Sequence, residues 1–410
     1  MRRLKKTLWT KNFTLVTAAS ALGAVGGIAG GFALSFLVFD ETGSTLASAL
    51  ILAIQLVPFF VLPLFLAPVM DRLPRKPFLV AGDLIDGVLY ALMGLYLLKF
   101  EFSYAAYLGY SLLLACLESF DELAFQSIYP KLIPEGMEQQ GYAVSTTLYP
   151  ILRVLMLPLA GVLLDAVGAA WILIGQGGLS LLAALIESNI DITEHRREGG
   201  EKLFTLRQWR ADIKEAAEYL KNERGVTGIF SYMAVTNGVA SGYSSILVAF
   251  FRTFPGFTAA MYSLFSVFEF VGRTLGGAVQ YKLKIAKEKK FGFTFIVYQI
   301  YELMDMCLLW LPYPLMLANR ALVGFLGANS ATMRQAAMQT YIPEELRARL
   351  NAFQNMLITA ASGVFTLAIG ALGEVLDYRL CVTICGATAF IAAWLLVWRR
   401  RADVRKIFEK

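Results

Sequence analysis

Residues 13–39 read FTLVTAASALGAVGGIAGGFALSFLVF, a run of 27 residues without a charged side chain. A helix needs about 20 mainly apolar residues to cross the hydrocarbon core of a bilayer, and this run is longer. The basic residues before it, in MRRLKK, could pass for the start of a signal peptide. The apolar run is too long for one and does not end in a cleavage-like site, so we expect a retained membrane helix.

The composition of the whole chain supports the same interpretation. Of its 410 residues, 57% are hydrophobic and 17% are charged, and the mean hydropathy is +0.58. A soluble protein of this length could not cover its surface with so few charges, because soluble domains carry about 25% charged residues. Four cysteines are too few for a disulfide scaffold, and a single histidine, His195, leaves little scope for histidine-based catalysis or metal binding. The chain is predicted to be an all-α polytopic membrane protein.

Further stretches of the chain are also long and apolar enough to cross a bilayer. They lack the strict alternation of membrane β-strands, so they are predicted to be helices. The twelve predicted spans are residues 13–39, 44–70, 77–98, 103–129, 141–165, 168–190, 226–251, 256–281, 291–312, 315–338, 350–375 and 379–398.

The basic residues predict the orientation of these spans. Alternate loops and the two termini on one side carry 30 of the 37 Lys and Arg residues, whereas the opposite side carries 4 and the spans carry 3. The four on the opposite side are Lys99, Arg252, Arg320 and Arg379. Because cytoplasmic loops carry the excess of Lys and Arg, both termini are predicted to be cytoplasmic. The net charge of +6 is therefore a topology signal, and we expect no nucleic-acid binding.

The chain also contains an internal repeat. The pattern Q-x6-IPE at residues 126–135 recurs at 335–344, an offset of 209 residues, and several other matches share nearly the same offset. We therefore expect two parallel six-helix halves, residues 1–190 and 226–410, related by an axis along the membrane normal. The linker 191–225 holds eight basic residues and an amphipathic stretch, which predicts a helix on the cytoplasmic membrane surface, with a regulatory role as the alternative.

Twelve spans in two halves, cytoplasmic termini and a basic central linker resemble the major facilitator superfamily. The segment APVMDRLPRK at 67–76 is similar to that superfamily's signature Gly-x3-Asp-Arg-x-Gly-Arg-Arg, although alanine and proline stand in place of its two glycines. The segments IYPKLIPE at 128–135, LPLAG at 157–161 and IKEAAEYL at 213–220 resemble the drug-exporter branch that includes macrolide and enterobactin exporters.

By this resemblance, Asp71, Arg72, Arg75 and Lys76 form a cytoplasmic gate. The physical chemistry is compatible with that role, because a carboxylate at a helix end accepts charge-assisted hydrogen bonds that one conformation makes and another breaks. The alternative is that the three basic residues only anchor the topology.

Ionisable residues inside predicted spans are costly in a membrane, by at least about 2.5 kcal/mol each, and therefore point to partners or pathways. In the fourth span Glu118, Asp121 and Glu122 share a helical face, and Arg153 of the fifth span is predicted to lie at the depth of Glu118. We expect an ion pair between Glu118 and Arg153, with Asp121 or Glu122 protonated near neutral pH. This cluster is a candidate for proton coupling or substrate binding, and structural pairing is the alternative.

A second charged cluster comprises Glu269 and Arg273 in the eighth span with Glu302 and Asp305 in the ninth. Glu269 and Arg273 have the favourable i, i+4 order for an ion pair. In the superfamily that the chain resembles, the third and ninth helices support the others from outside the cavity. The resemblance thus implies structural roles for Glu302 and Asp305, and likewise for Asp83 and Asp86 in the third span, which would brace the gate.

The repeated G-x3-G pattern of Gly23, Gly27 and Gly31 in the first span predicts a ridge for close helix packing.

The function that these patterns favour is secondary active transport. We expect a proton-coupled exporter, an antiporter of amphiphilic small molecules or drugs that works by alternating access. An importer or lipid translocator on the same fold is the alternative. A membrane-embedded enzyme or a sensor is disfavoured, because no nucleotide-binding loop, metal-ligand cluster or nucleophile–histidine pair is evident.

We expect no catalytic residues, no cofactor and no metal ion. The expected partners are a small amphiphilic substrate, protons and the lipid bilayer. The expected protein is a monomer that spans the cell (inner or plasma) membrane several times.

Overall fold

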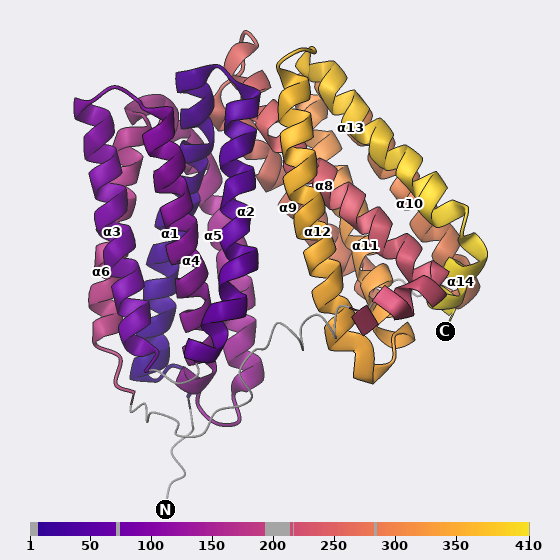
Figure 1. The fold of residues 1–410 in the computed structure, drawn as a ribbon, viewed down its shortest axis with the longest axis horizontal. Helices are drawn as coiled ribbons and strands as arrows, with labels where there is room; N and C mark the ends of the chain where they lie inside the picture. The colour runs from indigo at the N-terminus through magenta and orange to yellow at the C-terminus, as the bar shows by residue number, and fades with distance from the viewer. Residues whose placement is uncertain (1–6, 71–73, 193–213, 216, 283–284, 410) are drawn as a thin grey trace, which may run out of the picture. The chain divides into compact units, whose positions relative to one another are not determined.

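The computed structural model describes residues 7–70, 74–192, 214–215, 217–282 and 285–409, and most of these residues are helical (Figure 1). In the first half of the chain the helices are α1 (Lys11–Thr42), α2 (Thr45–Met70), α3 (Lys76–Lys99), α4 (Tyr104–Leu132), α5 (Glu138–Val167) and α6 (Ala169–Ser188). In the second half they are α8 (Arg224–Thr253), α9 (Ala259–Lys282), α10 (Lys287–Cys307), α11 (Tyr313–Tyr341), α12 (Glu344–Gly373), α13 (Tyr378–Ala392) and α14 (Arg401–Glu409).

The helix bounds follow the internal repeat. Helix α11 begins and ends 209 residues after α4, which is the offset of the repeated sequence pattern. The turn between α5 and α6 is made at Gly168, whose φ of 81° lies in the left-handed region that glycine adopts at little cost. The gate residues Asp71 and Arg72 and most of the predicted linker helix lie outside the described residues.

The helices form two compact units. The first comprises residues 1–42, 55–204 and 258–263, and the second comprises 43–54, 205–257 and 264–410. The start of α2 thus belongs to the second unit and the start of α9 to the first.

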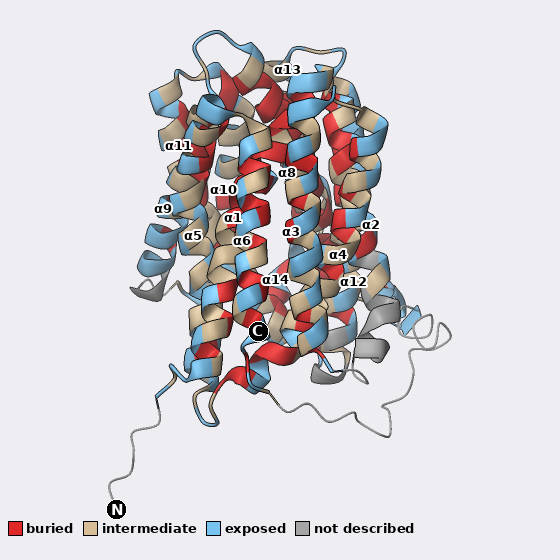
Figure 2. Ribbon diagram, turned by 90° about the vertical axis from the view of Figure 1, so that its left-hand side faces the viewer, coloured by how far each residue is buried: buried red, intermediate tan, exposed pale blue. Residues whose placement is uncertain are grey.

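Glycines let the helices of the first unit approach closely. A Cβ on Gly87 of α3 would lie 3.0 Å from the carbonyl oxygen of Gly177 in α6, and a Cβ on Gly177 would lie 2.7 Å from the carbonyl oxygen of Gly87. Helix α1 also packs on α6, where Gly26 and Gly30 face Gln176. Buried and exposed residues alternate along most helices, and parts of α1 and α8 are buried over several consecutive residues (Figure 2).

The predicted glycine ridge of α1 is displaced by one residue. A Cβ on Gly23, Gly27 or Gly31 would meet no described atom within 4 Å, whereas Gly26 and Gly30 lie against α6. The G-x3-G spacing is the same for both sets, and only the rotation of α1 about its axis decides which set packs.

In the second unit α8 packs extensively on α12, and α9 approaches α11 closely. A Cβ on Gly272 would lie 1.8 Å from the carbonyl oxygen of Ala321, and one on Gly324 would lie 2.1 Å from that of Glu269. The short α14 covers the end of this unit, with Val404, Ile407 and Phe408 buried in a core that also contains residues of α8, α10 and α11.

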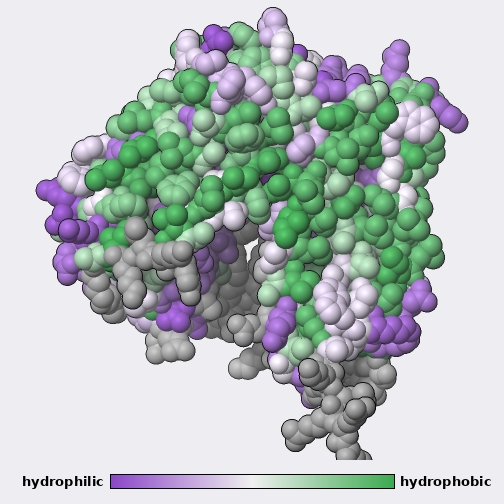
Figure 3. Space-filling view, turned by 180° about the vertical axis from the view of Figure 1, so that it is seen from behind, coloured by the Kyte–Doolittle hydropathy of each residue, from purple (hydrophilic) through white to green (hydrophobic). Residues whose placement is uncertain are grey.

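The outer surface of the helices is apolar. On α3 the side chains of Leu84, Val88, Leu92 and Leu95 are exposed at helical spacing, while the opposite side of the helix is buried against α6. Hydrophobic residues also cover much of the face in Figure 3, with hydrophilic residues gathered toward the helix ends. Such a surface is suited to lipid rather than water.

Eight of the described helical segments are long and apolar enough to cross a membrane. Helices α4, α9 and α11 are long enough but do not meet that criterion, and each of them carries ionisable residues.

Candidate functional site

Carboxylates gather between three helices of the first unit. Their electrostatic interactions connect Asp83 and Asp86 of α3, Glu118 and Asp121 of α4, and Glu187 of α6. We call these five residues, together with Glu122, the acidic cluster. The charged groups that act on Asp121 are Asp83, Glu122 and Glu118, all of them carboxylates among the described residues.

The close approach of α3 to α4 places Asp121 inside this cluster. A Cβ on Gly82 of α3 would lie 3.0 Å from Oδ1 of Asp121, so a larger residue at position 82 would press on the carboxylate. Among the described residues, three buried carboxylate oxygens in the cluster have no hydrogen-bond partner: Oδ1 of Asp86, Oδ1 of Asp121 and Oε2 of Glu187. Buried polar atoms are usually satisfied, so this arrangement favours the binding of a proton or a cation.

The predicted ion pair between Glu118 and Arg153 is not formed between these two described residues. Oε1 of Glu118 instead accepts a hydrogen bond of 3.4 Å from the hydroxyl of Tyr90, and Arg153 is exposed. The prediction placed the two residues at the same depth in the membrane, but depth does not determine which helices are neighbours. Helix α4 packs on α3, whereas α5 packs chiefly on α1.

Glu122 and Glu187 differ from Asp121 in their surroundings. Glu122 is exposed and accepts a hydrogen bond from Nε2 of Gln126, one turn further along α4. Glu187 is only 3% exposed, and its position near the end of α6 concealed it from the sequence analysis. A signal was available, since a carboxylate inside a helix after eighteen residues without a charged side chain is unusual in a membrane protein.

The described part of the predicted gate begins at Arg75 and Lys76. Arg75 is buried, at 8% exposure, and precedes the first turn of α3. Nζ of Lys76 donates a hydrogen bond of 2.7 Å to the carbonyl oxygen of Ser188, which joins the start of α3 to the end of α6. These two residues therefore lie at the same end of the unit as Glu187.

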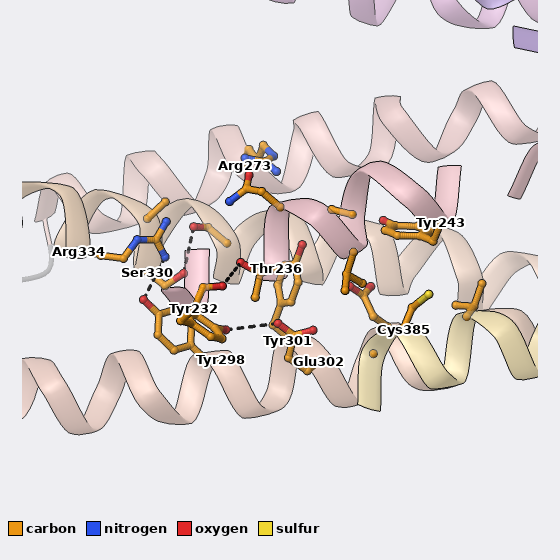
Figure 4. Close-up of a pocket in the computed structure, with 18 residues that line it drawn as sticks. Tyr232, Thr236, Tyr243, Arg273, Tyr298, Tyr301, Glu302, Ser330, Arg334 and Cys385 are labelled. Atoms are coloured by element: carbon orange, nitrogen blue, oxygen red, sulfur yellow. Dashed lines mark hydrogen bonds between the residues drawn. The ribbon is translucent and has the colours of Figure 1, made fainter. Parts of the chain in front are cut away.

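The second unit contains a cavity of about 250 Å³ between α8, α9, α10, α11 and α13 (Figure 4). Four tyrosines line it, and so do four charged residues. The tyrosines are Tyr232, Tyr243, Tyr298 and Tyr301, and the charged residues are Arg273, Glu302, Asp305 and Arg334. Three of the four predicted residues of the second charged cluster thus meet at one cavity, which the expectation of a purely structural role for Glu302 and Asp305 did not anticipate.

Two of these charges are neutralised by ion pairs. Nη2 of Arg273 lies 2.7 Å from Oε1 of Glu269, which confirms the predicted i, i+4 pair. Asp305 pairs with Nη2 of Arg320. The sequence analysis counted Arg320 with the basic residues of the non-cytoplasmic side. Arg320 lies within α11 and is 2% exposed, because its pairing with Asp305 offsets the cost of burial.

The other two charges are held by tyrosine hydroxyls. Oε1 of Glu302 accepts a hydrogen bond of 3.3 Å from Tyr232, and Nη1 of Arg334 donates one of 3.0 Å to the hydroxyl of Tyr298 (Figure 4). Glu302 is 3% exposed. Each of these side chains therefore retains unused hydrogen-bonding capacity at the cavity wall.

The internal repeat accounts for the space in the second unit. The positions in α11 that correspond to Glu118, Asp121 and Glu122 at the offset of 209 are Gly327, Ser330 and Ala331. All three line the cavity. Small residues in α11 thus leave open a volume on the side of the helix where α4 carries carboxylates.

Comparison with known proteins identifies a family. The model of the Major Facilitator Superfamily matches residues 13–299 and 303–409. No curated protein sequence matches the chain.

Solved structures of transporters share the fold. A bacterial homologue of the human lysosomal transporter Spinster, in an inward-facing conformation, superposes with a TM-score of 0.65 at 13% identity, covering 97% of this chain and 94% of its own. A peptide transporter in complex with alafosfalin has a TM-score of 0.70 at 11% identity, with coverages of 99% and 98%. The nucleoside transporter NupG has a TM-score of 0.70 at 11% identity, with coverages of 95% and 99%. At these identities the likeness is one of fold.

Proposed function

Because the chain belongs to the Major Facilitator Superfamily, a family of membrane transporters, we propose that it is a proton-coupled secondary transporter of small amphiphilic molecules. We further propose twelve spans in two six-helix halves that alternate access to the two sides of the membrane. The observation that carries the coupling is the acidic cluster, in which the charged groups around Asp121 are all carboxylates among the described residues.

A carboxyl group that is removed from water among other carboxylates is more stable when it holds a proton. Alternating access would change the solvation of this group, and a wetter environment would favour the anion. A substrate with a positive group near Asp121 or Glu122 would favour the anion too. Substrate and proton would then compete for one carboxylate, and antiport follows from that competition.

We propose export as the direction of transport, because three segments of the sequence resemble the drug-exporter branch. Everted vesicles that are energised by a proton gradient should accumulate a compound selected by a growth screen against toxic amphiphiles. If the protein is instead an importer or a lipid translocator, the compound should accumulate in right-side-out vesicles. Accumulation confined to right-side-out vesicles would reverse the proposed direction.

The double variant Asp121→Asn, Glu122→Gln tests the coupling. It should lose gradient-driven accumulation and also the substrate-induced proton release that a pH dye reports in detergent. Glu101→Gln, which alters an exposed carboxylate in the loop before α4, is the matched control and should retain both. If the double variant still transports uphill, the coupling carboxylate lies elsewhere and Glu302 is the next residue to change.

The gate remains a proposal from the sequence. If Asp71 and Arg72 help to close the cytoplasmic side, Asp71→Asn should slow turnover without lowering the amount of folded protein in the membrane. An unchanged transport rate at equal expression would remove Asp71 from the mechanism.

A further inference from the structure

We propose that the cavity of the second unit binds a small zwitterion, with its anionic group on Arg334 and its ammonium group on Glu302. This inference rests on the proposed function: it narrows the amphiphilic substrate to a zwitterion, and it assigns the ammonium group to Glu302 of the second unit rather than to Asp121 or Glu122 of the first. The cavity, its charges and its aromatic walls each contribute to the argument.

The size of the cavity favours a small ligand. At about 250 Å³ it is smaller than the pockets of ~300–1,000 Å³ that hold drug-sized molecules. The cavity therefore suits a compact molecule of amino-acid size more than a drug with several fused rings.

The charges of the cavity wall leave one acidic and one basic group available. Arg273 is neutralised by Glu269, and Asp305 is neutralised by Arg320, both through the ion pairs described above. Among the described residues, the remaining two side chains, Glu302 and Arg334, have tyrosine hydroxyls rather than opposite charges as hydrogen-bond partners.

A zwitterion satisfies both of these groups and adds no net charge to a buried site. A guanidinium binds a carboxylate through two parallel hydrogen bonds, and a carboxylate accepts hydrogen bonds from an ammonium group. A ligand with a single charge would leave either Glu302 or Arg334 without an opposite charge, which is costly out of water.

The tyrosines supply the remaining recognition. The rings of Tyr232 and Tyr298 lie 4.7 Å apart between centroids, and their hydroxyls orient the two charged side chains. Ring faces also attract an ammonium group and cover the apolar part of an amphiphilic ligand. Figure 4 shows Arg334 and Glu302 at separate positions along this aromatic wall.

Titration of the purified full-length protein in detergent tests the proposal. The probes are the twenty common amino acids, followed, for the one that binds most tightly, by its amide, which lacks the negative charge, and its N-acetyl derivative, which lacks the positive charge. Calorimetry should show saturable binding of the zwitterion, and at least about tenfold weaker binding of each singly charged derivative. Equal affinity of either derivative, or no saturable binding by any amino acid, would overturn the proposal.

Two variants assign the ends of the ligand. Arg334→Gln should weaken binding of the zwitterion at least about tenfold and leave the affinity for the amide unchanged. Glu302→Gln should also weaken binding of the zwitterion at least about tenfold, but it should leave the affinity for the N-acetyl derivative unchanged. Arg334→Lys, which keeps the charge, should restore part of the affinity and guards against a folding defect. Arg399→Gln, at an exposed position outside the cavity, should bind as the unmodified protein does. Unaltered zwitterion affinity in a folded Arg334→Gln protein would contradict the assignment.

Binding in detergent needs no proton gradient. A failed titration in a protein that still shows gradient-driven transport would therefore refute the zwitterion and leave the proposed coupling in place. Intact binding of the zwitterion without gradient-driven transport would refute the proposed coupling and leave the zwitterion site in place.

Discussion

At the scale of single residues, the buried charges of this protein depend on their partners. Arg320 is 2% exposed and pairs with Asp305, and its Nη1 lies 3.3 Å from the hydroxyl of Tyr243. A guanidinium so far from water costs several kcal/mol to bury unless a carboxylate compensates it. With the guanidinium buried there, its pairing with Asp305 stabilises the second unit whether or not the cavity beside it binds a ligand.

The first prediction concerns this pair. Asp305→Asn should lower the free energy of unfolding by about 3–5 kcal/mol, because it leaves the buried guanidinium without a carboxylate. Thermal unfolding in detergent measures the loss. The double variant Asp305→Asn, Arg320→Met should recover part of it, and strictly additive effects would show that the two side chains do not interact.

The second prediction concerns pH. The hydrogen bond and charge of Lys11 hold the pKa of Asp191 below its ordinary value of 3.8. Because the folded-state pKa is the lower one, the contact stabilises the protein above about pH 4 and is lost as the pH falls through the folded pKa. Asp191→Asn should therefore lower the melting temperature slightly at pH 6, and the difference should shrink as the pH falls below about 4. A difference that does not shrink on acidification would contradict the assignment, and the effect should be small because the pair is exposed.

At the scale of helices, small residues set the distances between neighbours. Helices α9 and α11 touch through Gly272 and Gly324, each of which faces a backbone carbonyl of the other helix. Arg273, Glu269 and Arg320 lie beside these glycines in the sequence or across the contact. The close approach therefore positions part of the cavity wall.

The third prediction tests that contact. Gly272→Ala should destabilise the protein by about 1–3 kcal/mol or more, because its Cβ would lie 1.8 Å from the carbonyl oxygen of Ala321. Gly277→Ala in the same helix is the matched control: its Cβ meets no described atom within 4 Å, so it should be neutral or stabilising by about 0.5–1 kcal/mol. Equal melting temperatures for the two variants would argue against close packing of α9 on α11.

At the scale of the whole molecule, the placement of its charges bears on which helices cross the membrane. Helices α4 and α11 are less apolar than the eight candidate spans and carry charged residues, although each has 29 residues and exceeds the length that a span requires. Their charges lie against other helices of the same unit, as Glu118 does against Tyr90 and Arg320 against Asp305. A charge that is satisfied within a unit does not prevent a helix from spanning.

The fourth prediction follows for topology. Reporters inserted at residues 101 and 135, on either side of α4, should report opposite sides of the membrane, and so should reporters at 312 and 343 around α11. A reporter at residue 200 and one at the carboxyl terminus should both be cytoplasmic. The same side for 101 and 135 would mean that α4 does not span.

Composition and the long apolar runs were enough to predict a helical membrane protein, because lipid restricts the backbone to helices or closed barrels and the runs lack the alternation of barrel strands. The family was predicted from resemblance, above all that of the segment APVMDRLPRK at 67–76 to the superfamily signature. The i, i+4 pair of Glu269 and Arg273 could be predicted because both residues belong to one helix, whose geometry is known in advance.

Only the tertiary structure decided which side chains from different helices meet. Depth along a hairpin suggested that Arg153 lies beside Glu118, but the rotation and neighbours of each helix placed Tyr90 there. The sequence also did not give the rotation and neighbours of the helices that carry Gly26 and Gly30, Glu187, and Arg320, and these decide what each of those residues contacts. Periodicity specifies the faces of a helix, whereas packing decides which face meets which neighbour. In the second unit that packing brings Gly327, Ser330 and Ala331 of α11 and Glu302 of α10 into the wall of one cavity.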